Sequence, residues 1–118
     1  MTFTLAPRLA ALAAAGAVAL ALPALAHPTV DVVASNWKFT PDTVEMHIGE
    51  TTTLHLTSTA GVHGIQSDDL GIPATTIAPG KFVDVEVTPK KAGTYKVHCS
   101  IVCGAGHGDM VLTIEVKP

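Results

Sequence analysis

The chain has 118 residues and a formal net charge of −3 at pH 7, and charged residues make up only 14% of it. This length is enough for one domain and argues against a multidomain protein. The acidic balance argues against nucleic acids and anionic membrane surfaces as partners, because both attract basic proteins.

The first 26 residues are predicted to form a secretory signal helix that is not part of the folded domain. Arg8 is the only charged residue there, and an Ala/Leu-rich run over 9–22 follows it. That run is shorter than the roughly 20 residues that a membrane-spanning helix needs. Pro23 and the sequence Ala24-Leu25-Ala26 then match a small-residue cleavage site. We therefore expect a signal over 1–26, export to the periplasm and a domain over 27–118, with membrane association only if the signal is retained.

Short runs in which apolar and polar residues alternate make up most of the remaining chain. In chain order, the apolar members are Val30, Val32 and Ala34; Val44, Met46 and Ile48; Leu54 and Leu56; Val83, Val85 and Val87; Tyr95 and Val97; and Met110, Leu112, Ile114 and Val116. A period of two is typical of strands with one buried face. About seven strands without a convincing helix predict an all-β domain, either an antiparallel β-sandwich or a Greek-key barrel.

Two segments interrupt this alternation and contain residues that bind metals. The first includes His63, and the second runs from 98 to 110 and includes Cys99, Cys103, His107 and Met110. Thiolate, imidazole and thioether groups together favour copper over zinc, calcium or magnesium. The spacing of Cys103, His107 and Met110, with a distant His63, is by itself that of a mononuclear blue-copper site.

Cys99 is surplus to a mononuclear site, because blue copper uses a single thiolate. Four residues before Cys103, it can place a second sulfur beside the first, and two thiolates can bridge two copper ions. His63 and His107 can then each bind one copper. Met110 can be a weak axial ligand to one copper, and the backbone carbonyl of Ile101 can bind the other.

The motif Cys99-Ser100-x-x-Cys103-Gly104-x-x-His107-x-x-Met110, with Val62-His63-Gly64 upstream, resembles the CuA domain of cytochrome c oxidase subunit II. The resemblance extends from about residue 36 to residue 116. It implies a cupredoxin fold and a two-copper electron-transfer centre whose ligands are His63, Cys99, the Ile101 carbonyl, Cys103, His107 and Met110. It also implies a redox donor such as cytochrome c, and an oxidase catalytic subunit or another protein as electron acceptor.

The sequence departs from the larger members of that family at several points. They have glutamate at the position of Ile101, where its side chain reaches a magnesium site shared with the catalytic subunit. The usual membrane hairpin is not recognised here, and the Trp-rich segment is reduced to Trp37 and Phe39. The chain therefore looks most like a short subunit II or a free-standing periplasmic CuA protein.

Three other interpretations of the motif remain at this point. The protein can be a mononuclear blue-copper carrier, a periplasmic copper-delivery protein, or a sandwich in which Cys99 and Cys103 form a structural disulfide. Trp37 is interpreted equally as a core residue or as part of an electron-accepting surface. The sequence contains no arrangement of catalytic residues, so the isolated chain is not expected to be an enzyme. Within an oxidase it would be the electron-accepting subunit.

Overall fold

The computed structural model describes residues 2, 16 and 27–118 of the chain. Apart from residues 2 and 16, the predicted signal helix over 1–26 lies outside the part that is described. Within the described residues, no helix has the length and apolar character needed to cross a membrane.

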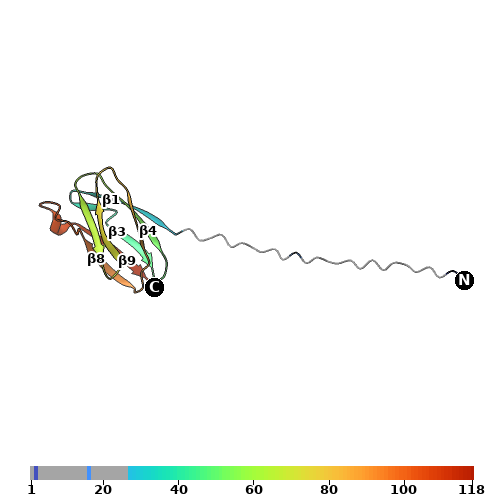
Figure 1. Cartoon of the computed structure of the whole chain (residues 1–118). Coiled ribbons are helices and arrows are strands. Elements are labelled where there is room, and N and C mark those ends of the chain that lie inside the picture. Colours follow the sequence, from blue (N-terminus) through green and yellow to red (C-terminus); the bar gives the residue numbers. More distant parts are fainter. Residues whose placement is uncertain (1, 3–15, 17–26) are drawn as a thin grey trace.

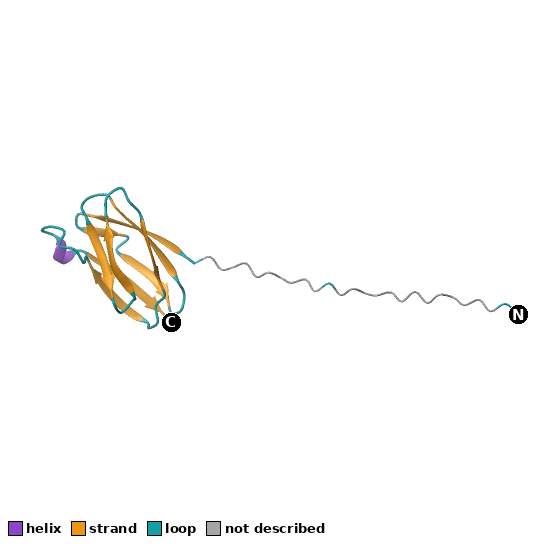
Figure 2. Cartoon of the chain, viewed as in Figure 1, coloured by secondary structure: helices purple, strands orange, loops and turns teal. Residues whose placement is uncertain are grey.

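The described part of the chain is an all-β domain, as the alternating runs predict (Figure 2). It contains a single-turn 3-10 helix, η1 (His107–Asp109), and nine strands instead of about seven. The strands are β1 (Thr29–Ser35), β2 (Lys38–Thr40), β3 (Thr43–His47), β4 (Thr52–Ser58), β5 (His63–Ser67), β6 (Ile72–Ile77), β7 (Val83–Val87), β8 (Gly93–His98) and β9 (Val111–Lys117).

The strands form two main sheets and one hairpin. The first sheet has the order β2-β1-β4-β7, the second has the order β3-β9-β8, and β5 pairs with β6. Two of the pairs, β1 with β4 and β3 with β9, are parallel. The other four pairs are antiparallel, as expected for a sandwich of this kind, and these two are the exceptions. Alternation reports which face of a strand is buried, but it carries no information on the direction of the neighbouring strand.

The core lies where the alternating apolar residues of the sheets meet. Leu54 and Leu56 of β4 and Ile114 of β9 are fully buried, while Thr53 and His55 between the leucines are only half-buried. This pattern is the expected consequence of side chains alternating between the two faces of a strand. The apolar core thus supports the strands whose ends carry the metal-binding residues.

The segment between β8 and β9 is a long loop at one end of the sandwich, away from the C-terminus (Figure 1). It contains η1 and all the ligand-type residues predicted between 98 and 110. β5, which begins at His63, lies beside β8. The two segments that interrupt the alternation in the sequence therefore meet at the same end of the domain.

Candidate metal centre

The loop over 99–110 is closed at its base by the sheet. β8 and β9 are antiparallel, with His98 opposite Val111 at their shared end. One residue further, the N–H of Cys99 donates a hydrogen bond to the carbonyl of Met110 at 3.0 Å. Because the ladder continues to both ends of the loop, Cys99 and Met110 are held at fixed positions by the strands.

A second hydrogen bond joins the loop to β5. The N–H of Ser100 donates to the carbonyl of Gly64 at 3.0 Å. The approach is so close that a Cβ on Gly64 would lie 2.6 Å from the Ser100 hydroxyl oxygen and 3.0 Å from Ile101 Cδ1. This contact brings Cys99 next to His63, although the two residues are far apart in the sequence.

The two cysteine sulfurs lie at the middle of the cluster. Both residues are free thiols, and the two Sγ atoms are 3.5 Å apart. His63 Nδ1 is 3.9 Å from Cys99 Sγ, and the ligand atoms of His63, Cys99 and Cys103 all lie within 4.8 Å of one another. These three side chains can therefore share a bound metal.

The remaining predicted residues lie on either side of the sulfur pair. His107 Nδ1 is 3.5 Å from Cys103 Sγ, and Met110 Sδ is 3.9 Å from the same sulfur. The carbonyl oxygen of Ile101 accepts a hydrogen bond from the thiol of Cys99 at 3.3 Å. The structure thus gathers all six predicted positions, with one imidazole beside each sulfur.

The cluster is deeply buried on one side and half-buried on the other. His63 and Met110 are fully buried and Cys99 is only 3% exposed, whereas Ile101, Cys103 and His107 are half-buried. Burial raises the pKa of the Cys103 thiol, and the hydrogen bond and charge of Cys99 raise it further. Without a cation, a second thiolate beside the first is therefore disfavoured.

The chemistry of the donor set fits copper. Soft sulfur ligands combined with imidazole select copper among the biological metals, and a thioether such as Met110 is a typical weak copper ligand. Cys99 and Met110 belong to the apolar core and Cys103 packs against it, which limits access of water to these donors. Such shielding influences the redox potential of a bound metal.

Trp37 covers the outside of the loop and is not a core residue, so the core-packing interpretation is wrong. Its side chain is 41% exposed, and its Nε1–H donates to the carbonyl of Cys103 at 2.9 Å. The indole ring lies against glycine backbone, since a Cβ on Gly106 would be only 2.6 Å from Trp37 Cδ2. The loop therefore needs glycine at this position to accept the ring.

The other histidines lie outside the cluster. His47 and His98 are exposed, and His47 Nε2 is 3.5 Å from a carboxylate oxygen of Glu45. His55 is hydrogen-bonded to Asp84 and stacks on Phe82, with ring centroids 4.6 Å apart.

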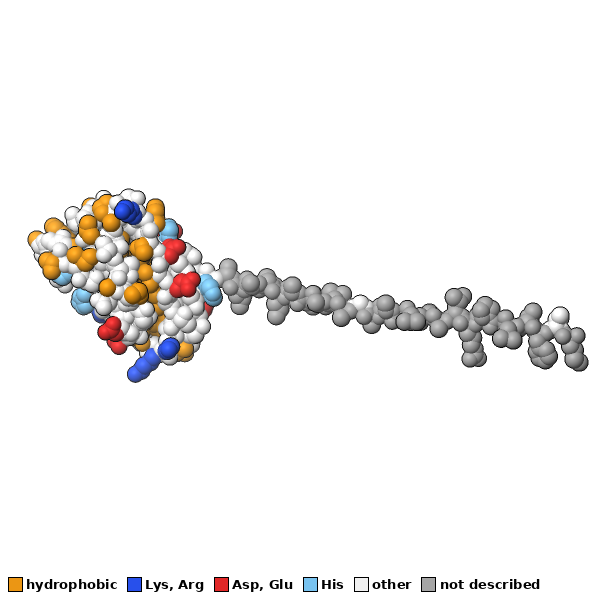
Figure 3. Space-filling view, viewed as in Figure 1, with side chains coloured by type: hydrophobic (Ala, Val, Ile, Leu, Met, Phe, Trp, Pro, Cys, Tyr) orange, Lys and Arg blue, Asp and Glu red, His pale blue; other side chains and the backbone are white. Residues whose placement is uncertain are grey.

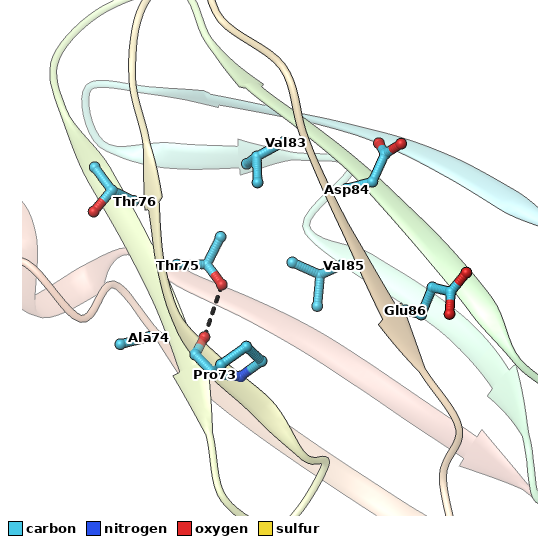
Figure 4. Close-up of a pocket in the computed structure, with 8 residues that line it drawn as sticks. All are labelled: Pro73, Ala74, Thr75, Thr76, Val83, Asp84, Val85 and Glu86. Atoms are coloured by element: carbon cyan, nitrogen blue, oxygen red, sulfur yellow. Dashed lines mark hydrogen bonds between the residues drawn. The ribbon is translucent and has the colours of Figure 1, made fainter.

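A separate groove of about 450 Å³ runs between β6 and β7 (Figure 4). Val83 and Val85 point towards β6, while the carboxylates of Asp84 and Glu86 point away from it. Its lining residues include no histidine, cysteine or methionine. The groove therefore adds nothing to the metal-binding cluster.

Sequence reasoning missed the residues that hold His63. Its Nε2 lies 2.7 Å from the carbonyl oxygen of Ala60, in a turn that begins at Ser58. The signal in the sequence for this contact was Gly61, two residues before His63. Glycine often marks a place where the backbone approaches another group closely.

Comparisons with known proteins agree with this architecture. The family model described as a cupredoxin-like domain matches residues 8–112. Cytochrome c oxidase subunit 2 of Thermus thermophilus is 33% identical over 89 residues, which are 75% of this chain and 65% of that protein. A second cytochrome c oxidase subunit 2 from the same species is also 33% identical over 89 residues, which are 52% of its length. The chain thus spans between about half and two thirds of these curated relatives.

Two solved structures illustrate the similarity in fold. The periplasmic domain of subunit II of cytochrome oxidase of Bradyrhizobium japonicum superposes with a TM-score of 0.70 at 15% identity, covering 81% of this chain and 88% of that one. Auracyanin of Roseiflexus castenholzii gives a TM-score of 0.58 at 16% identity, covering 79% of this chain and 99% of that one. At these identities the comparison establishes the fold alone.

Proposed function

The chain belongs to the cupredoxin-like domain family, and we propose that it is an electron-transfer protein with two copper ions in a CuA-type centre. Its similarity to cytochrome c oxidase subunit 2 supports this assignment. The proposed copper ligands are His63, Cys99, the carbonyl of Ile101, Cys103, His107 and Met110.

The observation that carries the proposal is the pair of sulfurs 3.5 Å apart, each with one imidazole nitrogen beside it. A mononuclear blue-copper site needs only one thiolate, which leaves the buried Cys99 without a role. Two thiolates between two metals use both cysteines and both histidines. The four-residue spacing of the cysteines disfavours a structural disulfide as the function of the pair, because such a bridge closes a very short loop and stabilises little.

The copper pair, when bound, would accept and release one electron at a time. The residues of the chain hold the donors in place beforehand, since strand hydrogen bonds fix Cys99 and Met110 and the Ser100–Gly64 bond fixes the loop on β5. A site that needs little rearrangement suits electron transfer. Burial of His63 and Met110 also argues against a copper-delivery protein, which must release its metal easily.

The surface near the cluster is suited to an electron-transfer partner. Val62, Val102 and Trp37 are 48%, 83% and 41% exposed. Val62 precedes His63, Val102 lies between the two cysteines, and Trp37 is hydrogen-bonded to Cys103. Apolar side chains are visible at the end of the molecule that carries the loop (Figure 3). We infer that a redox protein such as cytochrome c docks on these three residues, which we call the apolar rim.

Location and assembly follow as further parts of the proposal. We propose that residues 1–26 act as a secretory signal and that the domain over 27–118 works in the periplasm. The domain over 27–118 contains six lysines and ten acidic residues, so its net charge is −4. This charge favours a basic protein as the electron donor. The domain either carries electrons by itself or accepts them for the catalytic subunit of a terminal oxidase.

The decisive experiment is copper reconstitution of the reduced domain, with metal analysis and electron paramagnetic resonance. We expect two copper ions per chain and a spectrum in which one unpaired electron is shared between them. Cys99→Ser should leave at most one copper, whereas Ser100→Ala, which alters an exposed neighbour, should keep two. One copper in the wild-type protein with a blue-copper spectrum would instead support the mononuclear alternative. Rapid loss of copper to a weak chelator would support copper delivery.

A further inference from the structure

His63 is held in one orientation by a carbonyl of its own loop. The imidazole is fully buried, and its Nε2 lies 2.7 Å from the carbonyl oxygen of Ala60. A carbonyl can only accept a hydrogen bond, so Nε2 must carry the hydrogen. In the neutral ring Nδ1 then has the free lone pair, and Nδ1 is the nitrogen that faces Cys99 Sγ at 3.9 Å.

The position of the Ala60 carbonyl depends on Ser58. This serine is the last residue of β4 and is only 4% exposed. Its hydroxyl lies 2.6 Å from the carbonyl oxygen of Gly61 and 3.1 Å from that of Ala60, so its single hydrogen is directed at the two carbonyls of the turn. The side chain therefore closes a turn over residues 58–61, which ends two residues before His63.

Two further contacts leave the turn little room to move. The N–H of Thr59 donates to the carbonyl of Ala34 in β1 at 2.9 Å. Gly61 has a φ of +78°, and a Cβ there would lie 2.9 Å from His63 Nε2 and 2.5 Å from Asn36 Oδ1. A small shift of the turn would therefore move the imidazole as well.

We propose that Ser58 is a positioning residue for the metal centre: by closing the turn over residues 58–61 it selects the His63 tautomer whose Nδ1 is free to bind metal. This inference rests on the proposed function for its consequence, but the tautomer itself is a property of the metal-free protein. Hydrogen bonds to the second ring nitrogen of a metal-binding histidine commonly fix its tautomer and orientation.

The test begins with the reduced, metal-free protein, in which long-range ¹⁵N correlation spectra report which nitrogen of neutral His63 is protonated. In the wild type we expect a single form with the proton on Nε2. In Ser58→Ala the ratio of the two tautomers should shift by about fivefold towards the Nδ1-protonated form, the effect expected for loss of one hydrogen bond. The matched control is Thr57→Val, which removes the neighbouring hydroxyl that donates to the carbonyl of Lys81, and it should leave His63 unchanged.

A second measurement links the tautomer to copper. Copper should leave Ser58→Ala about tenfold faster than the wild type when a chelator is added, at the lower end of the effects typical of groups behind metal ligands. Thr57→Val should release copper at the wild-type rate. If Ser58→Ala does not fold, Ser58→Cys replaces it in the metal-free spectra, because a thiol is only a weak donor.

A proton on Nδ1 in the wild type, or unchanged tautomer and release rate in the Ser58 variant, would overturn the proposal. Failure of the proposed two-copper function would look different. The reconstituted wild type would then contain one copper or none, while the tautomer in the metal-free spectra would still depend on Ser58.

Discussion

The backbone N–H of Cys99 and the carbonyl of Met110 are joined by a hydrogen bond of 3.0 Å. The first and the last of the proposed ligands in the loop are therefore connected through the β8–β9 ladder. Between them the chain turns through η1 and returns with His107 beside Cys103. The base of the loop is held by the sheet, so the donors at its two ends are in place before a metal binds.

Copper should stabilise the domain. A ligand that binds only the folded state raises the free energy of unfolding, by about 4 kcal/mol when its free concentration is 1,000 times the Kd. We expect a higher midpoint of thermal unfolding for the copper-loaded protein than for the reduced metal-free protein. Calorimetry under anaerobic, reducing conditions provides the measurement. Equal midpoints would mean that the metal adds nothing to a loop that is already rigid.

The stability of the metal-free protein should depend on pH through Cys103. Burial, together with Cys99, raises the pKa of the Cys103 thiol in the folded state. The folded protein thus holds this proton more tightly than the unfolded chain, whose thiol has a pKa of about 8.5. This contribution is fully present below that pH and is lost as the pH rises through the folded-state pKa.

Urea unfolding of the reduced protein at several pH values can check this effect. The free energy of unfolding should fall as the pH rises above about 8.5. The decrease should be smaller in Cys103→Ser, in which the titrating thiol is absent. An identical decrease in both proteins would assign the pH dependence to other groups.

Gly106 and Gly108 should respond very differently to the same substitution. A Cβ at Gly106 would lie 2.6 Å from Trp37 Cδ2, whereas a Cβ at Gly108 would meet nothing within 4 Å. We expect Gly106→Ala to cost about 1–3 kcal/mol, as overpacking typically does, and to displace the indole from the Cys103 carbonyl. Gly108→Ala should change little. Thermal unfolding and Trp37 fluorescence measure the two effects, and similar results for both variants would contradict the contact.

Ile101→Glu should keep the copper content of the wild type. The proposed ligand at this position is the backbone carbonyl, whose oxygen is 3.3 Å from Cys99 Sγ and does not depend on the side chain. The new carboxylate would replace apolar surface near the metal, so the reduction potential should shift. Metal analysis and voltammetry check both statements, with Ile101→Leu as the volume-conserving control. Loss of both coppers in the glutamate variant would contradict a backbone role.

Val102→Glu should slow electron transfer from a cytochrome c donor by about tenfold, which corresponds to about 1.4 kcal/mol of lost contact. Val102 is 83% exposed in the apolar rim, so the substitution should leave the fold and the copper content unchanged. Ile48→Glu is the control, because Ile48 is also exposed but is hydrogen-bonded to Lys117 at the opposite end of β9. Stopped-flow kinetics measure the rates. An equal change of rate in both variants, in either direction, would contradict a docking site at Val102.

Much of the fold and of the candidate site could be predicted from the sequence, because both depend on local patterns. Alternating runs such as those of β4 and β7 identify strands with one buried face. Three strands were not identified: β2 has only three residues, β5 begins with His63 and Gly64, and β6 contains Pro73. Short length, glycine and proline all weaken the strand signal.

The types and spacing of the proposed ligands were also determined by the sequence alone. Four of the side chains lie within twelve consecutive residues, so their closeness required only a loop. Only the tertiary structure decided the distances between the sulfurs and the imidazoles, the directions of the strands, and the contacts of Trp37 and Ser58. Those contacts depend on which backbone carbonyls approach a side chain. Every residue has a backbone carbonyl, so the sequence does not indicate which carbonyls will lie beside a given side chain in the folded protein.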